Sequence, residues 1–336
     1  MMIRTLALVS CWLLPACSNE PLATDKTGKY AISGTCQPDQ LAATLRRHAD
    51  ATLVVDFGPG TQDLGEIAKA AGRTTPPFTV VVGPKPEAGQ ELADAVIVAE
   101  TGAPAAVDFA LLACNGVELQ PNRIEVGTRT FTAANRAAGG QPRVAPGDVL
   151  LAMMRMQHAA ALTRDPKEDV VHSVGLITCD PNASWQGAAA TATVAAAKLY
   201  PQVQLLRASP NGDATKTLPQ RATHLIEQGA RVLVVTTSDP ADTLAIQAAA
   251  ANGPDGAVPI IVIDPAVQAE HGTCVIGCSS ETVGKAVAAA VNELLPNGGS
   301  MVAWRTRQTK PIGSDQILWG GELTQRIAVR SADINR

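Results

Sequence analysis

The chain has 336 residues, enough for two domains of ordinary size, and 46% of them are hydrophobic. Only 3% are aromatic, so Ala, Val, Leu and Ile must build the cores. The net charge is −4, with 27 basic and 31 acidic residues spread along the chain, and this balance excludes the basic arm or patch that a nucleic-acid partner would need.

The first residues have the pattern of an export signal. Arg4 precedes an apolar stretch at 5–14, and residues 14–17 (LPAC) resemble a lipobox. In that pattern Cys17 carries the lipid and becomes the first mature residue, whereas ordinary secretion with cleavage after Ala16 is the alternative. Both patterns predict export, and the first predicts a lipoprotein anchored to a membrane and facing the periplasm or the cell exterior.

Beyond a polar tether at 18–29, short apolar runs alternate with helical stretches. No run reaches the ~20 apolar residues that a membrane-spanning helix needs. The first half is predicted to contain a helix at 39–50, a strand at 51–57, a helix at 63–72, strands at 78–83 and 95–100, a helix at 104–114 and a strand at 123–131. A Gly/Pro-rich joint at 137–147 and an apolar helix at 149–162 follow.

The second half repeats one unit, in which a β-branched strand is followed by a polar turn and a helix. Strands are predicted at 172–178, 231–237 and 259–264, then at 274–277 and at 300–304, with a helix at 316–327 near the end. This rhythm is typical of a doubly wound α/β fold. In such open parallel sheets, ligands bind outside the carboxyl ends of the strands.

Five cysteines remain after processing: Cys36, Cys114, Cys179, Cys274 and Cys278. The odd number leaves at least one thiol unpaired or paired between chains. Cys274 and Cys278 lie on or next to one short strand, where ~3.3 Å per residue separates them by ~13 Å, too far for a disulfide unless the strand ends between them. Buried thiols and one disulfide remain the main alternatives. A metal site is not expected, because no His or acid repeats the spacing that would complete four ligands.

From Ser173 onward the sequence resembles the amino-terminal lobe of periplasmic sugar-binding proteins of the ribose-binding type. The resemblance rests on the order of the segments 174–187 (VGLITCDPNASWQG), 220–229, 237–242 (TSDPAD), 263–265 (IDP), 274–277 and 281–284. The upstream strands and helices resemble parts that this family places later in the chain. The resemblance implies two doubly wound, Rossmann-like lobes, as in a type I periplasmic binding protein, in circularly permuted order.

A permuted chain of this family implies a division into five parts. These are a signal peptide at 1–17, a tether at 18–29, a carboxy-terminal-type lobe from 30–94, 120–132 and 300–330, an amino-terminal-type lobe from 95–119 and 170–295, and a permutation linker and helix at 133–169. The strand at 300–304 is then expected beside the strand at 51–57. New chain ends are tolerated where they fall in exposed loops. Two unrelated α/β domains that only look complementary are the alternative.

The resemblance implies a ligand held between two lobes that close about a hinge. Six residues are implied as ligand contacts: Asp180, Asn182 and Trp185 in the first turn, Asp239 and Asp264 after later strands, and Glu100 near the hinge. Trp185 falls where the family places an aromatic ring, although packing against its own lobe is the alternative. Asp239 precedes Pro240 and is equally suited to cap a helix.

The opposite lobe departs from the family pattern. Residues 57–60 (FGPG) and 83–86 (GPKP) stand where family members often present Asn-Asp and Asp, and 318–320 (LWG) where an arginine is expected. Trp304 or Trp319 would offer a stacking surface instead, with core packing as the alternative. Two explanations stay open: a ligand other than a pentose, or a fold that has lost its ligand.

Catalysis is not expected, because the sequence has no Gly-rich phosphate loop, G-x-S-x-G elbow or H-E-x-x-H helix. Asp56 and Glu100 would suit glycoside hydrolysis as a pair, but nothing in the sequence sets their separation. No cofactor or metal is predicted. The resemblance favours a solute-binding lipoprotein that delivers a small polar ligand, such as a sugar, to the permease of an ABC importer. A ligand-sensing subunit that acts with a sensor kinase, or a degenerate scaffold, is the alternative.

Overall fold

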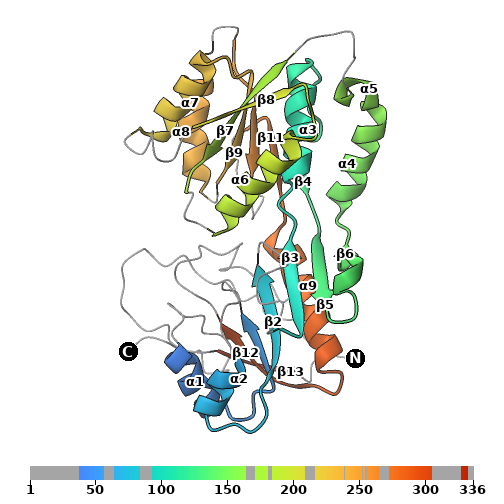
Figure 1. Cartoon of the computed structure of the whole chain (residues 1–336), viewed down its shortest axis with the longest axis vertical. Coiled ribbons are helices and arrows are strands. Elements are labelled where there is room, and N and C mark those ends of the chain that lie inside the picture. Colours follow the sequence, from blue (N-terminus) through green and yellow to red (C-terminus); the bar gives the residue numbers. More distant parts are fainter. Residues whose placement is uncertain are drawn as a thin grey trace, which may run out of the picture.

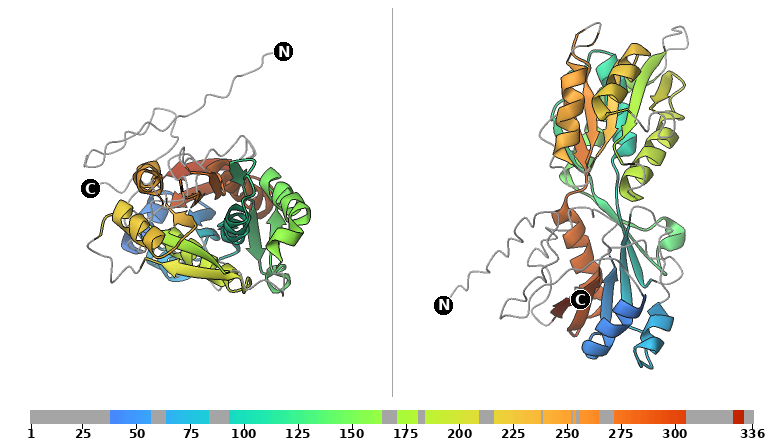
Figure 2. Two further views of the ribbon diagram at one scale, coloured as in Figure 1. Left: turned by 90° about the horizontal axis from the view of Figure 1, so that it is seen from above. Right: turned by 90° about the vertical axis from the view of Figure 1, so that its left-hand side faces the viewer.

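The computed structural model describes residues 38–56, 64–83, 93–163, 171–180, 184–208, 216–237, 239–251, 253, 256–264, 272–304 and 327–331. Two α/β lobes are stacked along the long axis (Figure 1). A narrow waist joins them (Figure 2). Each lobe contains one largely parallel sheet, so the predicted two-lobed α/β class is confirmed. No helix in these ranges has the length and apolar character needed to cross a membrane.

The lower lobe in Figure 1 is built on a seven-stranded sheet, in the order β13-β12-β1-β2-β3-β5-β6. In that order the strands are Ile327–Ser331, Gly299–Trp304, Leu53–Asp56, Phe78–Gly83, Ala95–Ala99, Thr128–Thr132 and Gln141–Arg143. The first five are parallel, whereas β5 and β6 are antiparallel to their neighbours. The predicted pairing of 300–304 with 51–57 is confirmed, because β12 lies beside β1 with Met301 opposite Leu53.

Both faces of the lower sheet are covered, as the alternation of side chains along a strand requires. Val54 and Val302 pack with α1 (Pro38–Arg47) and α2 (Leu64–Ala70). Leu53, Val80 and Ile97 belong to the main core with α9 (Ser280–Leu294), which lies against β2, β3 and β5. The uninterrupted apolar run of β3, which is buried at every residue, fits a central strand covered on both faces.

The upper lobe has a six-stranded sheet in the order β4-β11-β10-β9-β7-β8, and every pair in it is parallel. In that order the strands are Arg123–Glu125, Cys274–Gly277, Ile260–Ile263, Val232–Thr236, His172–Thr178 and Val203–Arg207. One face packs with α3 (Ala103–Cys114) and α6 (Ser184–Ala197) through Val234 and Ile276. The other packs with α7 (Leu218–Glu227) and α8 (Pro240–Ala250) through Leu233 and Val262.

The structure differs from the predicted division at two strands. The segment 95–119 was expected in one lobe, but β3 pairs with β2 in the lower sheet and only α3 lies in the upper lobe. The strand expected at 123–131 is two strands, because β4 pairs with β11 above and β5 with β3 below. The break falls at Gly127, where a Cβ would lie 1.9 Å from the carbonyl oxygen of Arg143.

The segment 133–169 was expected to be only a linker and a helix. Its described part contributes a short 3-10 turn (Arg136–Ala138), the edge strand β6 and two helices, α4 (Pro146–Gln157) and α5 (Ala159–Leu162). The helix predicted at 149–162 therefore begins earlier and is divided at His158, which ends α4 and precedes α5. Residue 327 starts a strand, and the rest of the helix predicted at 316–327 lies outside the described residues.

Four connections within the described ranges pass from one lobe to the other, at 100–102, 126–127, 144–145 and 278–279. We call 100–102 crossing 1, 126–127 crossing 2, 278–279 crossing 3 and 144–145 crossing 4. Crossing 1 joins β3 to α3, crossing 2 joins β4 to β5, crossing 3 joins β11 to α9, and crossing 4 joins β6 to α4. They lie at the edges of the two sheets near β4, β5 and β6.

Candidate functional site

The carboxyl ends of the parallel strands in both sheets point toward the waist. β11 must run toward the lower lobe, because crossing 3 follows it, and the other upper strands are parallel to it. β3 runs toward the upper lobe for the same reason, and β2, β1 and β12 are parallel to it. We call the space between these strand ends the interlobe region. Open α/β sheets bind ligands at such ends.

Each sheet also has a point where the strand order reverses. In the upper sheet β7 and β9 are neighbours. The chain passes from β7 to β8 on one side of this pair and from β9 to β10 on the other, so the two connections diverge. In the lower sheet β12 stands between β13 and β1 in the same way. The crevice at such a switch point is where doubly wound folds place a ligand. Both switch points lie at strand ends that border the interlobe region.

Asp180 lies at the upper switch point, just beyond β7, and is exposed. Its backbone N–H donates to Oε1 of Gln186 at 2.7 Å, which links the end of β7 to the first turn of α6. Gln186 is buried. Asn182, predicted beside Asp180, lies outside the described residues.

Trp185 is in the first turn of α6 and is only 5% exposed. Its side chain belongs to the main core, the position that the packing alternative anticipated. The indole Nε1 is buried without a hydrogen-bond partner within the described part of the chain. An unsatisfied buried donor costs stability.

Asp239 begins α8 and caps it. Its carboxylate accepts from the backbone N–H of Ala241 at 3.0 Å, with Pro240 as the first helical residue. The capping alternative is therefore confirmed. Thr237 supports the turn, since its hydroxyl oxygen accepts from the N–H of Asp239 at 3.0 Å and its hydroxyl lies 2.9 Å from the carboxylate of Asp242.

Two further carboxylates lie at strand ends. Asp264 follows β10 and is 3% exposed, and its backbone N–H donates to the carbonyl of Ile276 at 2.9 Å. Asp56 is the last residue of β1 in the lower sheet and is 8% exposed. Asp180, Asp239 and Asp264 thus follow β7, β9 and β10, three neighbouring strands of one sheet. Aspartates from both lobes therefore stand at strand ends that border the interlobe region.

Glu100 is set apart from this group because it lies in crossing 1. It forms an ion pair with Nε of Arg129 on β5 at 3.1 Å, and both side chains are partly exposed. The pair fastens crossing 1 to the lower sheet. Two residues that the sequence did not indicate are Thr236, whose buried Oγ1 lacks a partner among the described residues at the end of β9, and Glu125, the last residue of β4 before crossing 2.

Glu125 ties crossing 2 to crossing 3. Its carboxylate accepts hydrogen bonds from the hydroxyls of Ser279 and Thr282 at the start of α9. The backbone N–H of Val126 donates to the carbonyl of Gly277 at 2.8 Å. A Ser-x-x-Thr sequence before an apolar helix would have indicated the cap at Ser279, but its partner Glu125 is distant in the sequence.

The four cysteines in the described ranges are free thiols: Cys114, Cys179, Cys274 and Cys278. Cys36 lies outside these ranges. Burial raises the pKa of Cys274 to about 12 and that of Cys114 to about 11. Burial also raises the pKa of Cys278, as do the neighbouring carboxylates of Glu125, Asp148 and Glu100. These thiols are therefore poor nucleophiles at neutral pH. The described residues hold no cluster of three or more His, Cys, Asp or Glu that could bind a metal.

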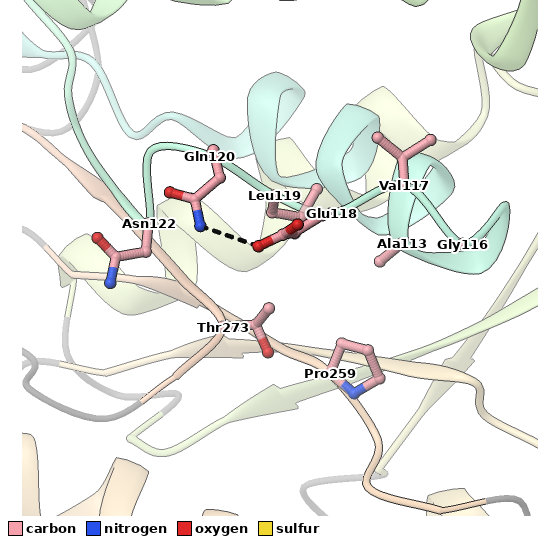
Figure 3. Close-up of a pocket in the computed structure, with 9 residues that line it drawn as sticks. All are labelled: Ala113, Gly116, Val117, Glu118, Leu119, Gln120, Asn122, Pro259 and Thr273. Carbon is pink, nitrogen blue, oxygen red and sulfur yellow. Dashed lines mark hydrogen bonds between the residues drawn. The ribbon is translucent and has the colours of Figure 1, made fainter.

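A pocket of about 430 Å³ opens at the other end of the upper lobe (Figure 3). Pro259 and Thr273, which precede β10 and β11, form one side of it. Glu118 and Gln120 on the other side are joined by a hydrogen bond of 3.3 Å. Because this pocket lies at the amino-terminal ends of the strands, it is separate from the interlobe region.

The fold and the strand ends define an α/β protein with two Rossmann-like lobes whose switch points border the interlobe region. No protein-family model matches the chain, and a search of curated proteins finds no match either.

Proposed function

We propose that this protein is a solute-binding protein that holds a small polar molecule between its two lobes. The single observation that carries the proposal is the pair of switch points that border the interlobe region, β7/β9 above and β12/β1 below. A ligand between them contacts both lobes at once, which is how hinged binding proteins couple binding to closure. The crossings lie on one side of this site, where a hinge is needed.

The proposal includes a permuted relationship to periplasmic sugar-binding proteins. The upper strands in chain order 7, 8, 9, 10 and 11 lie in the spatial order 2-1-3-4-5. The lower strands β12, β13, β1, β2 and β3 have the same spatial order if β12 and β13 are counted first. Two lobes with one shared order support a common origin, with the chain ends moved into the lower lobe.

The chemistry of the site favours a ligand rich in hydroxyl groups. Asp56, Asp180 and Asp264 provide carboxylate acceptors at strand ends, and hydrogen bonds from ligand hydroxyls to ionised carboxylates are stronger than those to neutral acceptors. Together with the lipobox at Cys17, this supports a lipid-anchored solute-binding protein that delivers a sugar or sugar-like molecule to an ABC importer.

The experiment is a thermal-shift screen of sugars, sugar alcohols and nucleosides. A ligand present at 100 times its dissociation constant stabilises the folded state by about 2.7 kcal/mol, so a binder raises Tm by several degrees. Asp180→Ala, at the switch point, should reduce the shift, whereas Asn122→Ala, in the distant pocket, should leave it unchanged. If no compound raises Tm at millimolar concentration, binding of this class is contradicted.

Sensing by the same site is the second candidate, since the two roles share a ligand and a hinge. Genes for a permease and an ATPase beside this gene would support transport. A histidine kinase gene there would support sensing instead.

A further inference from the structure

Crossing 4 is distinctive because it lies beyond the other three at the edge of the lower sheet. It leaves β6, which is the last strand in the order β3-β5-β6, and enters α4 on the upper lobe (Figure 1). The switch point β12/β1 is at the other side of the same sheet. Crossing 4 is therefore on the hinge side of the interlobe region, farthest from the ligand site.

Two glycines let crossing 4 approach crossing 2 more closely than other residues allow. A Cβ on Gly127 in crossing 2 would lie 1.9 Å from the carbonyl oxygen of Arg143. A Cβ on Gly147, in the first turn of α4, would lie 2.0 Å from the carbonyl oxygen of Glu125. The two backbones are in direct contact, with no space left between them.

One carboxylate oxygen joins the two crossings. Oδ2 of Asp148 accepts from the N–H of Gly127 at 3.0 Å and from the N–H of Ala145 at 2.8 Å. Hydrogen bonds to an ionised carboxylate are stronger than those between neutral groups. Asp148 therefore holds the start of α4 against crossing 2.

Both ends of crossing 4 are attached to the lobes. Below, Nη1 of Arg143 donates to the carbonyl of Lys285 in α9 at 3.1 Å. Above, Arg155 of α4 pairs with the buried Asp108 of α3 at 2.6 Å, and the hydroxyl of Tyr200 donates to the same carboxylate. Crossing 4 is thus a connection between two firmly packed elements.

We propose that crossing 4 is a strut that limits how far the lobes open, with Asp148 as its positioning residue. Separating the lobes at the switch points rotates them about the hinge and brings them closer on the hinge side. There Asp148 holds the first turn of α4, on the upper lobe, to Gly127, which directly precedes β5 of the lower lobe, and this hydrogen bond resists the rotation. The strut deepens the proposed binding function, because it sets the ligand-free separation from which the lobes close.

The test is the distance between the lobes in the ligand-free protein. Spin labels attached to p-acetylphenylalanine at Ala49 in the lower lobe and Leu244 in the upper lobe leave the cysteines untouched, and electron-electron double resonance measures their separation. Asp148→Ala should lengthen the mean distance and broaden its distribution. Asp148→Asn keeps an oxygen that accepts both N–H groups and should stay near the wild type. Glu281→Ala, which removes an exposed carboxylate from the first turn of α9, is the matched control and should change nothing.

Hydrogen exchange gives a second measurement. Asp148→Ala should speed exchange at the amides of Gly127 and Ala145 about tenfold, because each amide loses a hydrogen bond to a charged group and the free energy of such a bond corresponds to about that factor. Gly147→Ala forces α4 away from Glu125 and should also lengthen the interlobe distance. It replaces Asp148→Ala in the test if that variant does not fold. Unchanged distances in these variants would overturn the strut. Because no ligand is added, failure of the ligand screen leaves this result standing.

Discussion

At the scale of single residues, Asp239 combines a structural role with a position at the switch point. Its carboxylate caps α8 through Ala241. Asp239→Ala should lower the free energy of unfolding by about 1 kcal/mol, whereas Asp239→Ser retains a capping oxygen and should lose little. Urea unfolding measures both. Equal destabilisation by the two substitutions would contradict the cap, and a loss of ligand shift in the stable Ser variant would assign Asp239 a ligand contact as well.

Tyr200 provides a residue-scale prediction in alkaline solution. Burial and its hydrogen bond to Asp108 raise its pKa to about 12, from an ordinary value of 10.0. The folded state then binds this proton more tightly than the unfolded chain does. The stabilisation is complete below pH 10 and is lost as the pH rises from 10 toward 12. Urea unfolding across this window should show a smaller fall in Tyr200→Phe than in the wild type. The cysteines titrate equally in both proteins, so equal slopes would disprove the assignment.

At the scale of elements, glycines at the crossings have no space for a side chain, whereas some other glycines with positive φ do. Gly102 in crossing 1 has φ of +68°, and a Cβ there would lie 2.4 Å from Cγ2 of Ile276. Gly116, after α3, has a similar φ of +73° but nothing within 4 Å. Gly116→Ala should therefore cost only the backbone strain, of order 1 kcal/mol. Gly102→Ala adds a clash against β11, so urea unfolding should show a larger loss of stability than in Gly116→Ala. An equal loss in the two variants would mean that crossing 1 moves to relieve the clash.

Local sequence patterns predicted whether a segment forms a helix or a strand, but they did not predict to which lobe it belongs. Apolar runs such as Ile260–Ile263 predicted their strands because a buried parallel strand needs nothing but β-branched side chains. The split of β4 from β5 was missed because both alternate like one strand, and the break at Gly127 depends on Arg143, which the fold alone brings near. The cap at Asp239 was visible in Asp-Pro. The hydrogen bonds of Glu125 and Asp148 could not be predicted in this way, because tertiary packing brings their partners at the crossings near them.

At the scale of the whole molecule, chain order and spatial order disagree in a specific way. β12 and β13 come last in the sequence, but β12 pairs with β1, the first strand, with Val302 opposite Val54, and β13 pairs with β12. The upper sheet, in contrast, is built mainly from one continuous part of the chain. The permutation proposed above would account for both facts with one event.

Restoring the strand order that the proposed permutation implies tests this explanation. A rearranged protein would begin at residue 171, continue to 331, pass through a Gly/Ser linker to residue 38 and end at 163. Every strand pair is retained, and the new ends fall between α5 and β7, so it should fold with a Tm close to that of the wild type and show the same ligand shifts. A control opened at residue 234, inside β9, divides a central strand and should not fold. If the first protein also fails to fold, the connection between α5 and β7 is essential to the fold, and the permuted origin loses its support.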